Sequence, residues 1–357
     1  MQPSLPITAQ LTRRHTLFST MNRTLQPISA TQPASWPSLA RTGSWPATHD
    51  YVHLVTQMMG KPRLSLAPTL PGWAHTSLAL TPTGLTTRAL PTADGTVEAR
   101  LDFVDGTLRI AVHGGASRLV PLAPARAIAD IWADYRLALG DLGVPLEMWD
   151  KPQEMSDTTP FAEDFRPRDY DPVLAAEWFR LLTDVHNGFE EWRSPFFGRS
   201  GVNFWWGGFD LAVTLFNGRR AVPPPRSNFL MRYDLDAEHL SVGFWPGDDE
   251  REAMFFSYIV PDPPGCEEYP FEVRSASWAP TMGEWILSYE SIRTLPERWD
   301  LVRAFMDAVH GAAGNLAGWD VDSHTYAPPP RPETVDPERR PRSGRTYSRR
   351  DGRLRSA

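Results

Sequence analysis

The stretch VEARLDFVDGTLRIAV, at residues 97–112, restricts the fold more than any other part of the chain. Apolar and polar residues alternate on both sides of Asp105-Gly106, a dipeptide that favours a two-residue turn. A loop of that length places Asp102 opposite Arg109 on the exposed face. The segment therefore predicts two antiparallel strands with one apolar face, which other elements must cover.

Three further segments carry apolar residues at every third or fourth position, which is the spacing of one helix face. The second begins with Asp171, a helix-capping residue, and Pro172, which is favoured at the first helical position. Helices of this kind beside antiparallel strands predict an α+β fold, with antiparallel sheets and packed helices. The three apolar stripes run from Ile128 to Leu142, from Leu174 to Trp192 and from Trp299 to Leu316.

The same order of elements occurs twice. A strand that starts at Leu78 is followed 19 residues later by the hairpin at Val97 and then by a helix, and Phe256 and Ser275 begin a similar series. This order suggests two similar strand-hairpin-helix halves, residues 47–193 and residues 194–326. The alternative is that short strands and helices recur in this order without any duplication.

The two ends differ from the middle in composition. Residues 1–46 contain four arginines, no acidic residue and many Ser, Thr and Pro, so we expect a disordered tail, and Met1 and Met21 are alternative starts. Residues 327–357 carry nine arginines and four acidic residues, so they form a basic tail of net charge +5 on a body of −12. Binding of nucleic acid through this basic tail alone is one alternative, and a solvated appendage is the simpler interpretation.

Several classes of protein are excluded by what the sequence lacks. A lone cysteine, Cys266, excludes an internal disulfide and fits a reducing compartment, so we expect a cytoplasmic protein. No apolar run is long enough for a membrane helix, and no secretory signal is recognisable. Because the nucleotide-binding and hydrolase motifs are missing, the sequence predicts no cofactor and names no reaction.

His49 and His53 stand four residues apart in a predicted helix, a spacing that places two imidazoles on one face. No third ligand is apparent nearby. We therefore predict no metal site here.

The segment NFWWGGFDLAVTLFNGRR, at residues 203–220, is the main candidate for a site. In a strand, Phe209, Leu211, Val213 and Leu215 share the buried face, so Asp210 points to the other face beside Trp205 or Trp206. We expect a cavity there, with an arginine or lysine near the carboxylate. The alternative is an Asp that satisfies backbone donors.

Four segments resemble an uncharacterised bacterial family, the domain of unknown function 5996 family. They are QMMGKPRLSLAP, FWWGGFDLAVTLFNGRRAVPP, GFWPG and SYESIRT, and they spread from Gln57 to Trp319. The resemblance implies a shared architecture but no known activity. The positions that match the family pattern are Gln57, Lys61, Arg63, Trp206, Asp210, Arg219, Arg220, Glu238, Trp245, Glu290 and Arg293.

Two family positions differ in this chain. The family's Asn-His-Trp-Trp-like run is replaced by GWAH at residues 72–75, and Ala237 stands where the family has a histidine. His75 or His239 is the nearest substitute.

Three functions remain open from the sequence. The first is binding of a small anionic or sugar-like ligand in a cleft between the two halves, lined by Trp and Arg. The second is an enzyme with carboxylate acid/base chemistry, through Asp210, Glu238 or Glu290. The third is a structural or interaction protein without a small-molecule site. The ligand-binding candidates are Gln57, Lys61, Arg63, Trp206, Arg219, Arg220, Trp245 and Arg293.

Overall fold

The computed structural model describes residues 35–39, 43–248 and 250–326 of the chain. The predicted basic tail and residues 1–34 of the predicted N-terminal tail therefore lie outside the described residues. The helices are α2 (Trp45–Leu66), η2 (Pro71–Trp73), α3 (Ile128–Asp141), η3 (Phe161–Glu163), α4 (Pro172–Arg193), α5 (Phe229–Asp234), α6 (Tyr289–Ile292) and α7 (Arg298–Ala317).

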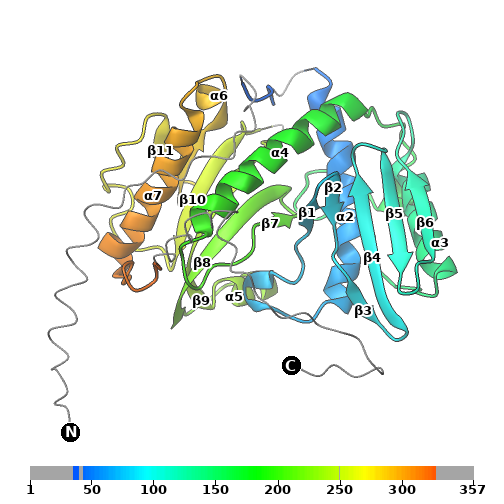
Figure 1. Cartoon of the computed structure of the whole chain (residues 1–357), viewed down its shortest axis with the longest axis horizontal. Coiled ribbons are helices and arrows are strands. Elements are labelled where there is room, and N and C mark those ends of the chain that lie inside the picture. The colour runs from blue at the N-terminus through cyan, green and yellow to red at the C-terminus, as the bar shows by residue number, and fades with distance from the viewer. Residues whose placement is uncertain (1–34, 40–42, 249, 327–357) are drawn as a thin grey trace, which may run out of the picture.

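The strands form two antiparallel sheets, which confirms the α+β fold (Figure 1). The first sheet has the order β1-β2-β4-β5-β6, with β3 also paired to β4, and the second has the order β11-β12-β10-β9-β8-β7. The first contains β1 (Ala79–Thr81), β2 (Gly84–Thr86), β3 (Leu90–Thr92), β4 (Gly95–Asp102), β5 (Thr107–Val112) and β6 (Ser117–Pro121). The second contains β7 (Asn203–Trp205), β8 (Asp210–Arg220), β9 (Ala237–Trp245), β10 (Met254–Val260), β11 (Ala276–Ala279) and β12 (Glu284–Ser288).

The two sheets meet along the edge strands β1 and β7. A pair of backbone hydrogen bonds of 2.8 and 3.0 Å joins Leu78 to Phe204, whose side chains are both fully buried. In this seam the chain brings residues 73–78 next to residues 203–206. Aromatic side chains from both sheets therefore gather at one place.

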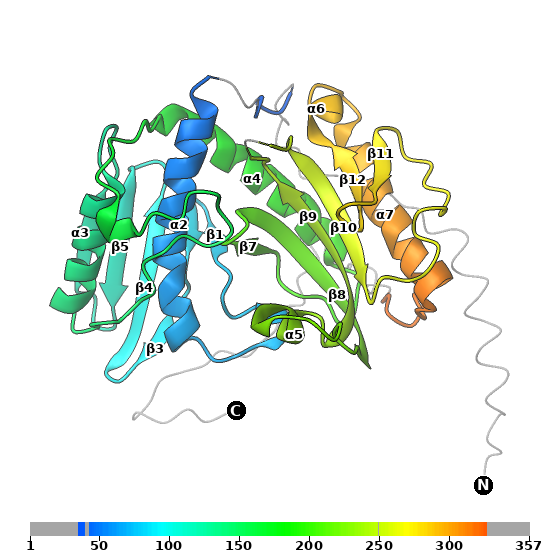
Figure 2. The ribbon, with the colours of Figure 1, turned by 180° about the vertical axis from the view of Figure 1, so that it is seen from behind.

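The long helices cover one face of the second sheet and leave the other face open. Helix α4 packs on β8 and on α2, and α7 packs on β9, β10 and β12 (Figure 1). Seen from behind, the opposite face of β8, β9 and β10 is bordered by the short helix α5 (Figure 2). In the part of the chain that the structure describes, no helix is both long enough and apolar enough to cross a membrane.

The predicted helices form where their apolar stripes lie. Asp171 caps α4, because its Oδ1 accepts the N–H groups of Val173 and Leu174 at 2.8 and 3.3 Å. These bonds satisfy two of the donors that the first helical turn leaves unpaired. Trp178, Val185 and Phe189, on the predicted face, are buried.

The hairpin forms, but its predicted register is wrong by two residues. Asp102 lies opposite Thr107, and Arg109 lies opposite Arg100. The cause is the turn: Asp102 Oδ1 accepts the N–H groups of Val104 and Asp105 at 2.8 and 2.9 Å. This side-chain turn ends the ladder early and lengthens the loop to four residues. Because the shift is an even number, the apolar residues keep their common face.

The N-terminal segment contributes to the core inside the range predicted as a tail. The Trp36 side chain is 1% exposed and stacks on Tyr289 at 5.7 Å between ring centroids. Its Nε1–H donates to Asp184 Oδ2 at 2.7 Å, and its backbone N–H donates to the Arg293 carbonyl at 3.0 Å. Helix α2 begins at Trp45. The composition of residues 1–46 did not reveal Trp36 and Trp45 as buried residues, because each is a single aromatic residue among polar ones.

The suggested duplication stays a prediction. In the first sheet, β2 pairs with β4, the first arm of its hairpin. In the second sheet, β10 pairs with β12, the second arm of the β11–β12 hairpin. The two series therefore share their order along the chain but differ in their pairing.

Candidate functional site

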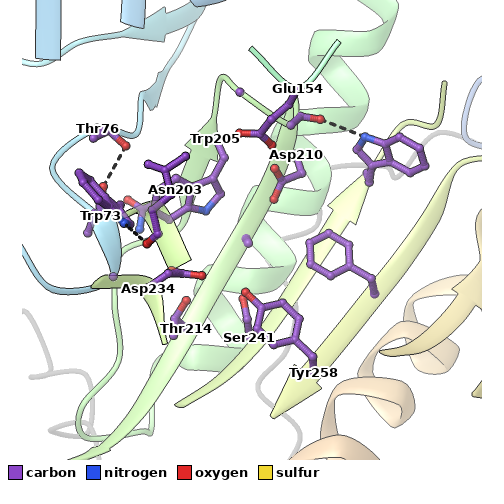
Figure 3. A pocket seen from close by; sticks show the side chains of 18 of the residues that line it. Trp73, Thr76, Glu154, Asn203, Trp205, Asp210, Thr214, Asp234, Ser241 and Tyr258 are labelled. Carbon is purple, nitrogen blue, oxygen red and sulfur yellow. Dashed lines mark hydrogen bonds between the residues drawn. The ribbon is translucent and has the colours of Figure 1, made fainter. Parts of the chain in front are cut away.

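A cavity of about 600 Å³ lies on the open face of the second sheet. Its floor is made by alternate residues of β8, β9 and β10, because successive side chains of a strand point to opposite faces. Along β8, Leu211, Val213 and Leu215 are buried on the helix side, while Asp210 and Thr214 line the cavity (Figure 3). The strand face predicted for Asp210 is the one observed.

Aromatic side chains form much of the wall. Trp205 and Trp206 come from β7 and the turn after it, and Trp73 comes from the short helix η2. Figure 3 shows Trp73 and Trp205 near each other. Trp206 is fixed, because its Nε1–H donates to the Thr76 carbonyl at 2.7 Å across the seam. The same ring lies over Gly60, where a Cβ would come within 2.3 Å of it. The remaining aromatic residues of the wall are Phe216, Trp245, Phe256 and Tyr258.

Four carboxylates face this cavity: Glu154, Asp210, Asp234 and Glu284. Burial raises the pKa of Asp210 well above its usual range, and the neighbouring Glu154 raises it further. Burial also raises the pKa of Glu284 to about 7, against the opposing effect of Arg251. The charges that act on Asp210 are therefore carboxylates, whereas we expected an arginine or lysine beside it.

Glu154 and Asp210 are close neighbours. A point at the Cβ position of Gly208 is 2.9 Å from Asp210 Oδ1 and 3.4 Å from Glu154 Oε2, so these oxygens are at most about 6.3 Å apart. A Cβ on Gly207 would come within 2.5 Å of Glu154 Oε1. The two glycines thus give the glutamate room to approach the strand. Glu154 lies at the exposed edge of the cavity, where partial desolvation raises its pKa and Asp234 adds to the rise.

The backbone is strained at three places around the site. Trp73, Glu154 and Phe209 have φ angles of 55°, 58° and 63°, a region that residues with a side chain rarely adopt. Such conformations cost on the order of 1–3 kcal/mol each and cluster at functional sites. Here they direct one wall residue and one carboxylate into the cavity and set the start of the strand that carries Asp210.

Helix α2 holds the loop that presents Glu154. The buried Gln57 side chain donates to the Gln153 carbonyl and accepts the Gln153 N–H, both at 2.7 Å. Lys61 Nζ donates to the Lys151 carbonyl at 2.8 Å, and burial lowers its pKa to about 8. Both residues come from the segment that matches the family pattern. Their contacts place them as supports of the loop, away from the cavity itself.

Trp245 closes one end of the cavity. Its Nε1–H donates to the Gly208 carbonyl at 3.0 Å, and the Arg251 guanidinium lies 4.5 Å from its ring centroid. Among the residues that line the cavity, Arg251 is the one Lys or Arg. The wall is therefore rich in tryptophan, as expected, but poor in arginine.

The other candidate residues lie outside the cavity lining and are paired with other groups of the protein. Arg219 binds Glu238 at 2.8 Å and Arg293 binds Glu290 at 2.6 Å. Arg220 pairs with Asp236 at 3.2 Å and is mostly exposed, and the buried Arg63 donates to the Thr87 carbonyl. These are structural contacts of the β8 end, the N-terminal segment and α2.

The histidines around the cavity mainly make structural contacts. His53 Nε2–H donates to the Gly207 carbonyl at 2.8 Å, and burial lowers its pKa to about 3, so it stays neutral. His239 lines the cavity, where burial lowers its pKa, whereas His75 stacks on Trp73 outside the lining. Within the ranges that the structure describes, no group of three or more His, Cys, Asp or Glu is arranged to hold a metal ion.

Three of the four cavity carboxylates were missed from the sequence. Glu154 lies in an irregular segment without periodicity, and Asp234 ends a short helix. Glu284 had a usable signal: it opens the second arm of the predicted hairpin, where alternation places it opposite the buried face that Trp285 occupies.

The raised pKa of Glu284 predicts a pH-dependent gain from Glu284→Gln. Since the folded pKa of about 7 exceeds the usual value of 4.5, this group favours folding below pH 4.5 and loses that contribution as the pH rises through 7. The variant and wild type should have the same free energy of unfolding at pH 4.5. At pH 8 the variant should be more stable by on the order of 2 kcal/mol. Thermal denaturation at both pH values measures this, and equal melting at pH 8 would contradict it.

A family model described as a family of unknown function, DUF5996, matches residues 36–326. The chain therefore belongs to that family, which confirms the resemblance seen in the sequence. No curated protein and no solved structure matches the chain.

Proposed function

We propose that this member of the DUF5996 family is an enzyme that binds a small, uncharged, sugar-like molecule in the sheet cavity and exchanges protons with it through Asp210 and Glu154. The observation that supports this most is the pair of neighbouring carboxylates in an aromatic-walled cavity. Pairs of acids whose environments separate their pKa values are the usual basis of acid and base roles at one pH.

The lining favours an uncharged polyhydroxylated ligand over an anionic one. Four carboxylates and one arginine give the cavity an acidic character, so an anion would be repelled. Tryptophan rings offer flat apolar faces, and carboxylates, Ser241 and Asn203 offer hydrogen-bond partners for hydroxyl groups. The anionic ligand considered from the sequence is therefore not proposed.

The two carboxylates take different roles because their surroundings differ. Asp210 has a pKa well above its usual range because of burial and of Glu154, so of the two carboxyl groups it keeps its proton more readily and acts as the acid. Glu154 is the more exposed of the two, and desolvation raises its pKa less strongly than that of Asp210, so it loses its proton first and acts as the base. The charge of Glu154 raises the pKa of Asp210 further, which separates the two roles.

The test is a screen of neutral saccharides by thermal shift, followed by product analysis of each hit. A bound saccharide raises the melting temperature by mass action. We expect Glu154→Gln to keep binding and to lose turnover by roughly 10²–10⁴-fold, the usual contribution of a general acid or base. If saccharides bind wild type but are never converted, the protein binds sugars without being an enzyme. The absence of any hit would refute the whole proposal.

Gly207→Ala provides a second test, because it moves Glu154 without changing any charge. The new Cβ would lie 2.5 Å from Glu154 Oε1, and the flexible carboxylate must move away. A displacement near 1 Å can lower turnover by roughly 100-fold. Gly201→Ala is the matched control, since its Cβ meets only Asn203 Oδ1 at an ordinary 3.6 Å. Equal turnover of the two variants would mean that the position of Glu154 does not matter.

A further inference from the structure

A second cavity, of about 460 Å³, shares part of its wall with the first. The residues common to both linings are Glu154, Gly208, Trp245 and Arg251. We propose, building on the proposed function, that this second cavity is a subsite for the second unit of a two-unit, uncharged, polyhydroxylated substrate. Each cavity alone has the volume of a typical small-molecule site.

The shared wall places the Glu154 carboxylate between the two units of the substrate. Glu154 lines both cavities, and the Trp245 ring is fixed by its hydrogen bond to the Gly208 carbonyl and by the stacked Arg251. A ligand that spans the two cavities therefore passes beside the Glu154 carboxylate. The proposed base then lies at the junction of the units and not at one end of the ligand.

The second cavity contains a buried polar atom that lacks a partner. His49 is 8% exposed, and its Nδ1 is 3.2 Å from Asp50 Oδ1. Since a carboxylate only accepts, Nδ1 carries the proton of this hydrogen bond, and in the neutral ring Nε2 is left as an acceptor. Nε2 has no hydrogen-bond partner among the described residues. Buried polar groups are normally paired. Because Nε2 has almost no accessible surface, a ligand hydroxyl can fill this role once the ring turns toward the cavity.

The two arginines of the second cavity are already paired with carboxylates. Arg168 pairs with Asp164 and lies 3.6 Å from Asp157, and Arg251 pairs with Asp248 at 3.0 Å. An anionic group would have to compete with these carboxylates for the arginines. The second unit is therefore expected to be polar and uncharged, like the first.

The experiment compares one-unit and two-unit probes on variants of the second cavity. The probes are methyl glucoside and methyl galactoside, and the disaccharides maltose, cellobiose and lactose, with dissociation constants measured by calorimetry. His49→Phe keeps a ring of similar size but removes the acceptor, and Ser156→Trp fills the cavity from its exposed side. Ser291→Trp, at an exposed residue outside both linings, is the matched control.

For wild type and the Ser291→Trp control, at least one disaccharide should bind about 10-fold or more tightly than the methyl glycoside. Both second-cavity variants should remove this advantage and leave the dissociation constant of the methyl glycoside unchanged. The subsite is refuted, while the proposed function stands, if a methyl glycoside binds and no disaccharide binds more tightly. The same holds if the variants weaken the binding of methyl glycosides and disaccharides equally. If neither probe size binds wild type, both proposals fail together.

Discussion

Replacing Asp210 by Asn should lower turnover by roughly 10²–10⁴-fold and at the same time raise the melting temperature above pH 7. The first effect follows from the loss of the proposed proton donor. The second follows from the raised pKa, because ionising this carboxylate in the folded protein is opposed by burial and by Glu154. The asparagine keeps the shape and lacks the charge, so it avoids that cost.

The sign of the stability effect can be checked by varying the pH. A carboxyl group with a raised folded pKa supports folding while it is protonated and loses this contribution as the pH rises. The melting temperatures of wild type and Asp210→Asn, recorded without ligand, should therefore be equal near pH 4. Above pH 7 the variant should melt at the higher temperature. An asparagine variant that is less stable at every pH, or that turns over its substrate normally, would remove Asp210 from the proposed role.

Replacing Trp36 by Ala should cost roughly 3–5 kcal/mol, which makes it the most destabilising substitution that we predict. The ring is buried and packs on Tyr289 and Trp299, with centroid distances of 5.7 and 5.3 Å. The substitution also removes the donor of the hydrogen bond to Asp184. Chemical denaturation should show a lower midpoint with an unchanged slope.

Two truncations separate the anchor from the residues before it. Removal of residues 1–34 keeps Trp36, whereas removal of residues 1–43 deletes it together with Leu39. We expect the second truncation to melt roughly 6–10 °C below the first, given the usual relation between free energy and melting temperature. Trp36→Phe should fall between wild type and Trp36→Ala. Identical melting of the two truncations would contradict the role of this segment.

Periodic patterns carried most of the information that the sequence offered. The helices α3, α4 and α7 and the strands β4 and β5 follow stripes that depend only on local spacing. The face of Asp210 was predictable for the same reason. The hairpin register was not, because it depends on a side chain that bonds to its own turn.

The remainder of the site depends on contacts between distant segments. Glu154 lies near Asp210 on a loop that Gln57 and Lys61 hold, and nothing in the loop's own pattern marks it. The family resemblance pointed to Gln57 and Lys61 but could not say whether they touch a ligand or a backbone. Arginines such as Arg219 and Arg293 looked available in the sequence, whereas the fold pairs them with Glu238 and Glu290.

The seam between the sheets gives the cavity a means of changing its width. Trp73 and Thr76 lie on one side of the Leu78–Phe204 bridge, and Trp205 and Trp206 lie on the other. Two main-chain hydrogen bonds, the Trp206–Thr76 bond and the Ser77–Asn203 bond of 2.9 Å span this line, fewer contacts than the seven residue pairs that join β9 to β10. A small rotation of one sheet against the other would therefore change the spacing between Trp73 and Trp205. Amide hydrogen exchange at Leu78 and Phe204 would measure this rotation, and a bound ligand should slow the exchange.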